Sequence, residues 1–84
     1  MILHQDEIWV YVNNSYIVSV RMGMPTPYNQ NYKCFISTIK EMIIVESENQ
    51  EEIRKLHNEI VMTLHGVGIS SDTVIEVPKE VQFV

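Results

Sequence analysis

Residues 47–66, SENQEEIRKLHNEIVMTLHG, are the most clearly helical stretch of this 84-residue chain. Large apolar residues recur in it at three- and four-residue spacing and so share one stripe of a helix. They are Ile53, Leu56, Ile60 and Leu64. Gly66 follows them, and glycine commonly ends a helix. The stretch therefore predicts one amphipathic helix.

The start of this helix carries its own signals. Ser47 and Gln50 stand at the spacing of a capping box, in which the serine oxygen accepts an orphan N–H and the glutamine reaches back. Glu51 can pair with Lys55 one turn later. The glutamates near the start are also compatible with the helix dipole. They are Glu48, Glu51 and Glu52.

The strongest β signal lies near the N-terminus. Residues 8–12 and 16–20 are rich in β-branched and aromatic side chains, which fit a pleated surface. Asn13 and Asn14 lie between them, and asparagine tolerates the left-handed conformation of a two-residue hairpin turn. We therefore predict an N-terminal β-hairpin that turns at Asn13 and Asn14. In that register one face carries Trp9, Tyr11, Tyr16, Val18 and Val20.

The remaining segments complete the predicted architecture. Residues 32–45 fit either a helical stripe or strands, and we expect two strands at residues 33–39 and 41–45. After a loop at residues 68–72, residues 73–77 predict a strand that Pro78 ends or confines to an edge. Residues 81–84 alternate weakly and predict a further edge segment. The chain is thus expected to be one α+β domain, residues 1–84, with the helix packed on one face of a mainly antiparallel sheet.

Charge is divided along the chain. Residues 8–40 contain three basic residues and no carboxylate, whereas residues 41–84 contain nine acidic residues against three basic ones. Six of the seven aromatic residues also lie within residues 8–40. Such asymmetry bears on partners and not on the fold.

The acidic residues around the helix start have two interpretations. The plainer one is a solvated helix terminus with charges that suit the dipole. The other is a negative patch that docks on a basic protein surface, with mimicry of nucleic-acid phosphates as its sharpest form. The residues concerned are Glu46, Glu48, Glu51 and Glu52.

Several reactive residue types lack the companions that catalysis or metal binding needs. Cys34 lies in an apolar run and is expected to be a buried filler. His57 and His65 are about 12 Å apart on the helix, too far for one metal ion. Gly66-Val67-Gly68 follows a helix, the reverse of a phosphate loop, and Ser70-Ser71-Asp72 has no adjacent histidine. We therefore expect no enzyme activity, no catalytic residues, no cofactor and no metal.

The chain is expected to be cytoplasmic. The longest apolar run, residues 42–45, is far shorter than the ~20 residues that span a bilayer, and the first seven residues are acidic where a signal peptide is basic. A charged fraction of 20% leaves apolar surface for a partner or a second copy to cover.

These observations favour a non-enzymatic protein-binding module. We expect a regulator or inhibitor, of the kind phages encode, that occupies the surface of a partner such as a basic nucleic-acid-binding protein. The residues expected to bind the partner are Glu46, Glu48, Glu51, Glu52, Trp9, Tyr11 and Tyr16. A homodimer is also expected. One alternative is a structural subunit of a homo-oligomer. The other is a single-stranded nucleic-acid binder that stacks bases on the aromatic hairpin face. The acidic net charge makes nucleic acid an unfavoured partner.

Overall fold

The computed structural model describes residues 1–66 and 73–84, in which seven strands form two sheets beside one α-helix. Sheet A has the order β2-β1-β6, with β1 at Ile2–Gln5, β2 at Ile8–Tyr11 and β6 at Val74–Glu76. Sheet B has the order β3-β4-β5-β7, with β3 at Ile17–Gly23, β4 at Tyr32–Thr38, β5 at Met42–Ser47 and β7 at Gln82–Phe83. The helix α1 spans Gln50–His65.

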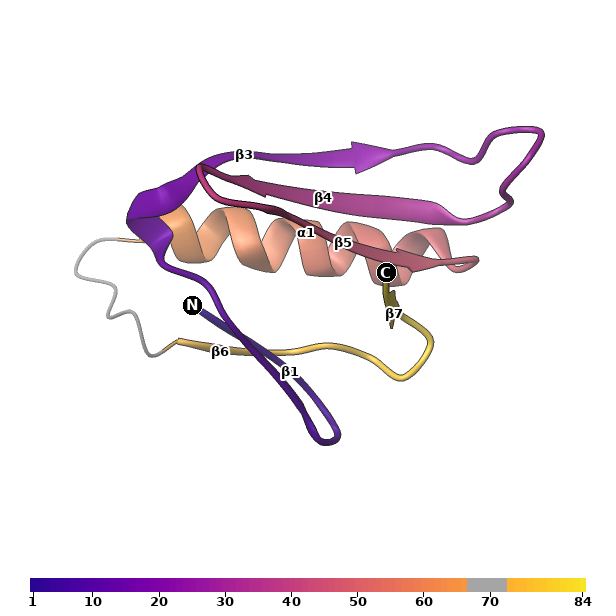
Figure 1. Cartoon of the computed structure of the whole chain (residues 1–84). Coiled ribbons are helices and arrows are strands. Elements are labelled where there is room, and N and C mark those ends of the chain that lie inside the picture. The colour runs from indigo at the N-terminus through magenta and orange to yellow at the C-terminus, as the bar shows by residue number, and fades with distance from the viewer. Residues whose placement is uncertain (67–72) are drawn as a thin grey trace.

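The predicted α+β class is confirmed. Strand pairs are antiparallel except for β1 with β6, which is parallel. Sheet B lies on one side of the molecule, and α1 and sheet A lie together beneath its inner face (Figure 1). The apolar core fills the space between them. Its buried side chains are Met1, Leu3, Val12, Cys34, Ile36, Val45, Ile53, Leu56, Ile60, Ile75, Val77 and Val81.

The helix forms where its apolar period predicts it, but its first turn is capped differently. Ile53, Leu56 and Ile60 are buried, as the predicted stripe requires. The cap is Asn49, whose side chain accepts from the N–H groups of Glu51 and Glu52. The capping box predicted for Ser47 and Gln50 is therefore wrong.

Ser47 serves the segment before the helix instead. It is buried as the last residue of β5, and its hydroxyl oxygen accepts from the Asn49 N–H at 3.0 Å. This bond holds the capping residue in place, so Ser47 supports the helix start indirectly. Gly66 follows the helix as expected, with φ −69° and ψ 140°.

The N-terminal hairpin exists, but it pairs β1 with β2 and turns at Asp6 and Glu7. The prediction that residues 8–12 pair with residues 16–20 is wrong, because β2 and β3 belong to different sheets. Asp6 takes the left-handed conformation, with φ 51°, which short polar side chains tolerate.

The two asparagines that predict the turn use their side chains elsewhere. Asn13 caps a short 3₁₀-helix, Asn14–Tyr16, and its side chain accepts from the Ser15 N–H at 2.9 Å. The Asn14 side-chain oxygen Oδ1 accepts from the Met1 amine at 2.9 Å. Local side-chain bonds of this kind compete with a hairpin turn, and they carry the chain from sheet A to sheet B.

The other strands follow the predictions. The strand interpretation of residues 33–45 is confirmed by β4 and β5. The strand after the helix is β6, at an edge of sheet A, and the C-terminal segment adds β7 to the edge of sheet B. The loop predicted at residues 68–72 lies outside the described residues. In the described residues, no helix is long and apolar enough to cross a membrane.

Candidate binding surface

The outer face of sheet A is fixed by the alternation of its three strands. Leu3 and Ile75 are buried and paired, and Val10, opposite Leu3, packs against the core. Because successive side chains on a strand point to opposite faces, the neighbours of these three residues point away from the core. Two outward rows result, Tyr11–Ile2–Val74 and Trp9–His4–Glu76.

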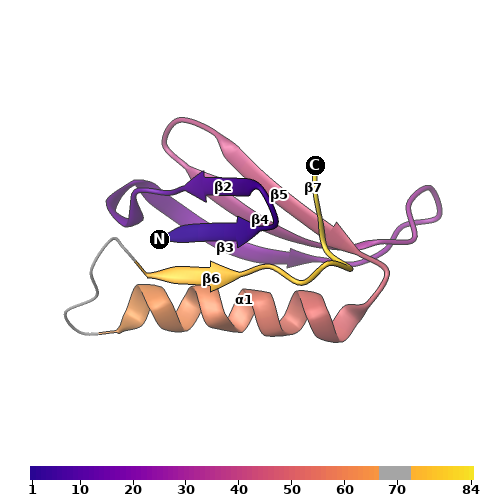
Figure 2. The ribbon, with the colours of Figure 1, turned by 90° about the horizontal axis from the view of Figure 1, so that it is seen from below.

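Large apolar side chains on this face are open to solvent. Trp9 is 50% exposed, Tyr11 71% and Val74 46%. Neither α1 nor sheet B covers the face, which is turned toward the viewer in Figure 2. We call Trp9, Tyr11, Ile2 and Val74 the aromatic face. Contiguous apolar surface of this kind is typical of interaction sites.

The ring of Trp9 is held in a defined orientation by His4. Their ring centroids are 3.9 Å apart with an interplanar angle of 29°. His4 is itself fixed, because its Nδ1 lies 2.9 Å from both carboxylate oxygens of Glu76 and its Nε2 lies 2.8 Å from the carbonyl oxygen of Asp6. The indole is therefore held in one orientation in the folded chain.

This arrangement favours the protonated imidazole. Both acceptors need an N–H, and only the imidazolium has two. The hydrogen bond to Glu76 raises the pKa of His4 above its ordinary value of 6.5, with smaller contributions from the Asp6 carbonyl and from the negative charges of both residues. The Glu76 side chain is 72% exposed, so the ion pair adds little stability. The ion pair instead holds the His4 ring in a fixed orientation.

The structure separates the three aromatic residues predicted to bind a partner. Trp9 and Tyr11 share the outer face of β2, but Tyr16 lies in the 3₁₀-helix beyond it. Lys40 places its ammonium 5.2 Å from the centroid of the Tyr16 ring. Tyr11 and Tyr16 do line one shallow hollow of about 170 Å³, so Tyr16 borders the aromatic face without belonging to it.

The four predicted acidic residues are also divided. Glu46 is on β5, and its carboxylate lies 3.9 Å from the Lys33 ammonium. Glu51 pairs with Arg54 at 3.3 Å. Glu52 lies beside Glu51 in the first turn of α1, so the four residues come from more than one element.

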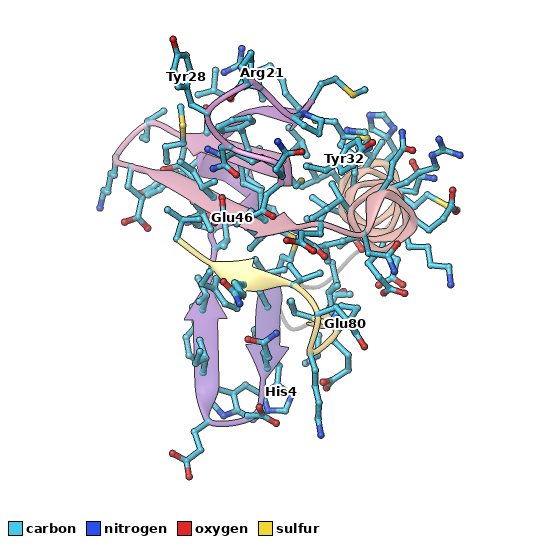
Figure 3. The ribbon with its side chains drawn as sticks, turned by 90° about the vertical axis from the view of Figure 1, so that its right-hand side faces the viewer. His4, Arg21, Tyr28, Tyr32, Glu46 and Glu80 are labelled. Carbon is cyan, nitrogen blue, oxygen red and sulfur yellow. The ribbon has the colours of Figure 1, made fainter. Side chains whose placement is uncertain are left out.

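Two of them share a hollow with an acid that the sequence analysis missed. Glu46 and Glu48 line an open, polar hollow of about 490 Å³ together with Glu80. Glu80 comes from the segment between β6 and β7, and Figure 3 shows it and Glu46 on the side that faces the viewer. No local sequence pattern predicts this neighbour, because Glu80 lies 32 positions after Glu48, the nearer of the two along the chain.

Cys34 occupies the position expected of a core filler. Its side chain is fully buried, and burial raises the pKa of the thiol to about 11. A thiol is nucleophilic as its thiolate, so this environment disfavours reaction at Cys34. Across residues 1–66 and 73–84 no three His, Cys, Asp or Glu side chains are grouped to hold a metal ion.

Comparisons of the chain with models of protein families, with curated proteins and with solved structures found no match.

Proposed function

We propose that this protein is a small cytoplasmic protein-binding module that acts as a regulator or inhibitor by covering a partner's surface with its aromatic face. The observation that carries the proposal is the exposure of Trp9 and Tyr11, 50% and 71%, on an uncovered sheet face. Tryptophan and tyrosine are enriched among the residues that dominate binding energy at interfaces.

The fixed ring of Trp9 adds to this argument. A side chain that is ordered only on binding costs roughly 0.5–1.5 kcal/mol in lost rotamer freedom. His4 already holds the indole, and Glu76 holds His4. Much of that cost is therefore met during folding, and burial of the ring contributes more fully to affinity.

The charges around the face favour a basic partner. Asp6 and Glu7 form the turn of the hairpin, and Glu76 extends the row of Trp9 and His4. Residues 2–11 and 74–76 contain neither lysine nor arginine. A partner with an apolar depression bordered by lysine or arginine is complementary to this surface, as a nucleic-acid-binding protein would be.

The same charges weigh against the nucleic-acid alternative. Base stacking on Trp9 and Tyr11 would bring phosphates toward Asp6, Glu7 and Glu76, with His4 as the nearest basic group on the sheet. Phosphate attraction supplies most of the affinity in such complexes. A homo-oligomer remains the other alternative, and it predicts a melting temperature that depends on protein concentration.

The proposal is tested by quantitative capture from nuclease-treated lysate of the cells that make the protein. Trp9→Ala and Tyr11→Ala should each reduce the amount of the captured stoichiometric partner at least tenfold, with the fold retained by circular dichroism. Tyr28→Ala is the matched control, because Tyr28 is 99% exposed and lies at the opposite end of the molecule from His4 (Figure 3). Equal capture by all three variants would contradict the proposal.

A further inference from the structure

The free edge of β3 borders an apolar groove. In the described part of the chain, β3 pairs with β4 on one side and with no strand on the other. The groove beside it measures about 310 Å³ and runs between β3 and the end of α1. Its lining residues are Ile17, Val18, Ser19, Val20, Val61, Leu64 and His65. An edge strand offers a row of backbone N–H and C=O groups to any further strand.

The position of α1 decides what can occupy this edge. The helix packs on the inner face of sheet B and lies toward β3 (Figure 2), although it also contacts β4 and β5. Paired strands are 4.7–4.9 Å apart, whereas packed helices need about 8–10 Å. Two copies joined through β3 would bring their two helices close together, because α1 lies on the β3 side of the sheet. A single extended segment with no helix beneath it fits without this conflict.

The charges near the edge indicate which kind of extended segment fits there. Arg21 is the charged residue of β3, and its guanidinium lies over the Phe35 ring, 5.8 Å from the centroid, on the outer face of sheet B. Residues 8–40 contain no carboxylate. Among the groove-lining residues that the structure describes, His65 is the ionisable one. A carboxylate on the added strand would therefore meet a cation, and neither β3 nor its neighbour β4 carries an acid.

We propose that β3 binds an extended segment of a partner protein as an added strand, with alternate apolar side chains in the groove and a carboxylate beside Arg21. Main-chain bonds give such strand addition its affinity, and the alternate side chains give it specificity. This site is separate from the aromatic face and has the opposite charge preference. One chain can thus hold a basic surface and an acidic, extended segment at the same time.

The test is selection from a displayed library of random decapeptides, followed by affinity measurement on the most enriched synthetic peptide. The enriched sequences should carry apolar residues at every second position and Asp or Glu between them. Val18→Lys, which is 68% exposed in the groove, and Arg21→Glu should each weaken binding at least tenfold.

Two controls separate this site from others. Met62→Lys changes an exposed residue of the same helix that does not line the groove, and it should leave the affinity within twofold. Tyr11→Ala should also leave it unchanged, so failure of the aromatic-face proposal and failure of this one are distinguishable. An unenriched library, or a peptide that binds Val18→Lys and Arg21→Glu as tightly as the unmodified chain, would overturn the inference.

Discussion

The imidazole of His4 is clamped between the indole of Trp9, with ring centroids 3.9 Å apart, and the carboxylate of Glu76, 2.9 Å from its Nδ1. The three residues come from β2, β1 and β6, so the contact joins all three strands of sheet A. It links the protonation of one histidine to the placement of the aromatic ring most suited to binding.

His4 should titrate above pH 6.5 in the folded protein, because its hydrogen bond to Glu76 raises its pKa. The folded state then holds this proton to higher pH than the unfolded chain. The contribution to stability is complete below pH 6.5 and is lost as pH rises through the folded pKa. Proton NMR of the His4 ring gives the pKa, and urea unfolding at pH 5.5 and 8.5 gives the stability.

Glu76→Gln is the control for this titration. It removes the largest cause of the raised pKa, so the His4 pKa should fall toward 6.5 and this part of the pH dependence should shrink. A His4 pKa that is the same in both proteins would show that the ion pair does not form in solution.

Asn49 and not Ser47 should behave as the helix cap. Asn49→Ala leaves the first N–H groups of α1 without their acceptor and should lower the free energy of unfolding by about 1 kcal/mol. Asn49→Asp keeps an acceptor and should retain stability. Urea unfolding measures both variants, and a cost confined to the alanine variant supports the observed cap.

Gly23 should resist substitution because of Phe35. An added Cβ at position 23 would lie 2.6 Å from Cε2 of the Phe35 ring, so the ring must move. Gly23→Ala should therefore destabilise the protein by about 1 kcal/mol. In a Phe35→Ala background the same change should be neutral or stabilising, because alanine restricts the unfolded chain. Additive effects in this double-mutant cycle would contradict the close approach.

Charge reversal should distinguish the two acidic regions. Asp6→Lys with Glu7→Lys alters the border of the aromatic face and should weaken partner binding about tenfold or more. Glu51→Lys with Glu52→Lys alters the helix start, where Glu51 is already paired with Arg54, and should have a smaller effect. Titration calorimetry with the captured partner measures both effects. The opposite ranking would place the binding site at the helix start.

The sequence predicts best what depends on neighbours along the chain. The spacing of Ile53, Leu56 and Ile60 fixes one face of a helix regardless of what covers it, and the strand propensity of residues 33–45 is satisfied in β4 and β5. The helix cap is displaced by two residues because Ser47 and Asn49 are both good caps. Only the folded structure shows that Ser47 is buried at the end of β5.

The hairpin shows where local reasoning fails. Asn13 and Asn14 are strong turn formers, yet their side chains bond to Ser15 and Met1. The first residues instead pair in parallel with β6, more than 70 positions later in the chain. This long-range pairing creates the aromatic face, so the sequence suggests Trp9 and Tyr11 as binding residues without their neighbours Ile2, His4 and Val74.

The central claim is that the aromatic face contacts the partner, and site-specific photo-crosslinking tests it most directly. A benzophenone amino acid placed at position 11 should form a covalent adduct with one protein in living cells, and His4→Ala should reduce its yield by releasing Trp9. The same group at position 28, which is fully exposed, should form no such adduct. Crosslinking at position 28 and none at position 11 would contradict the account and place the binding surface at the opposite end of the molecule.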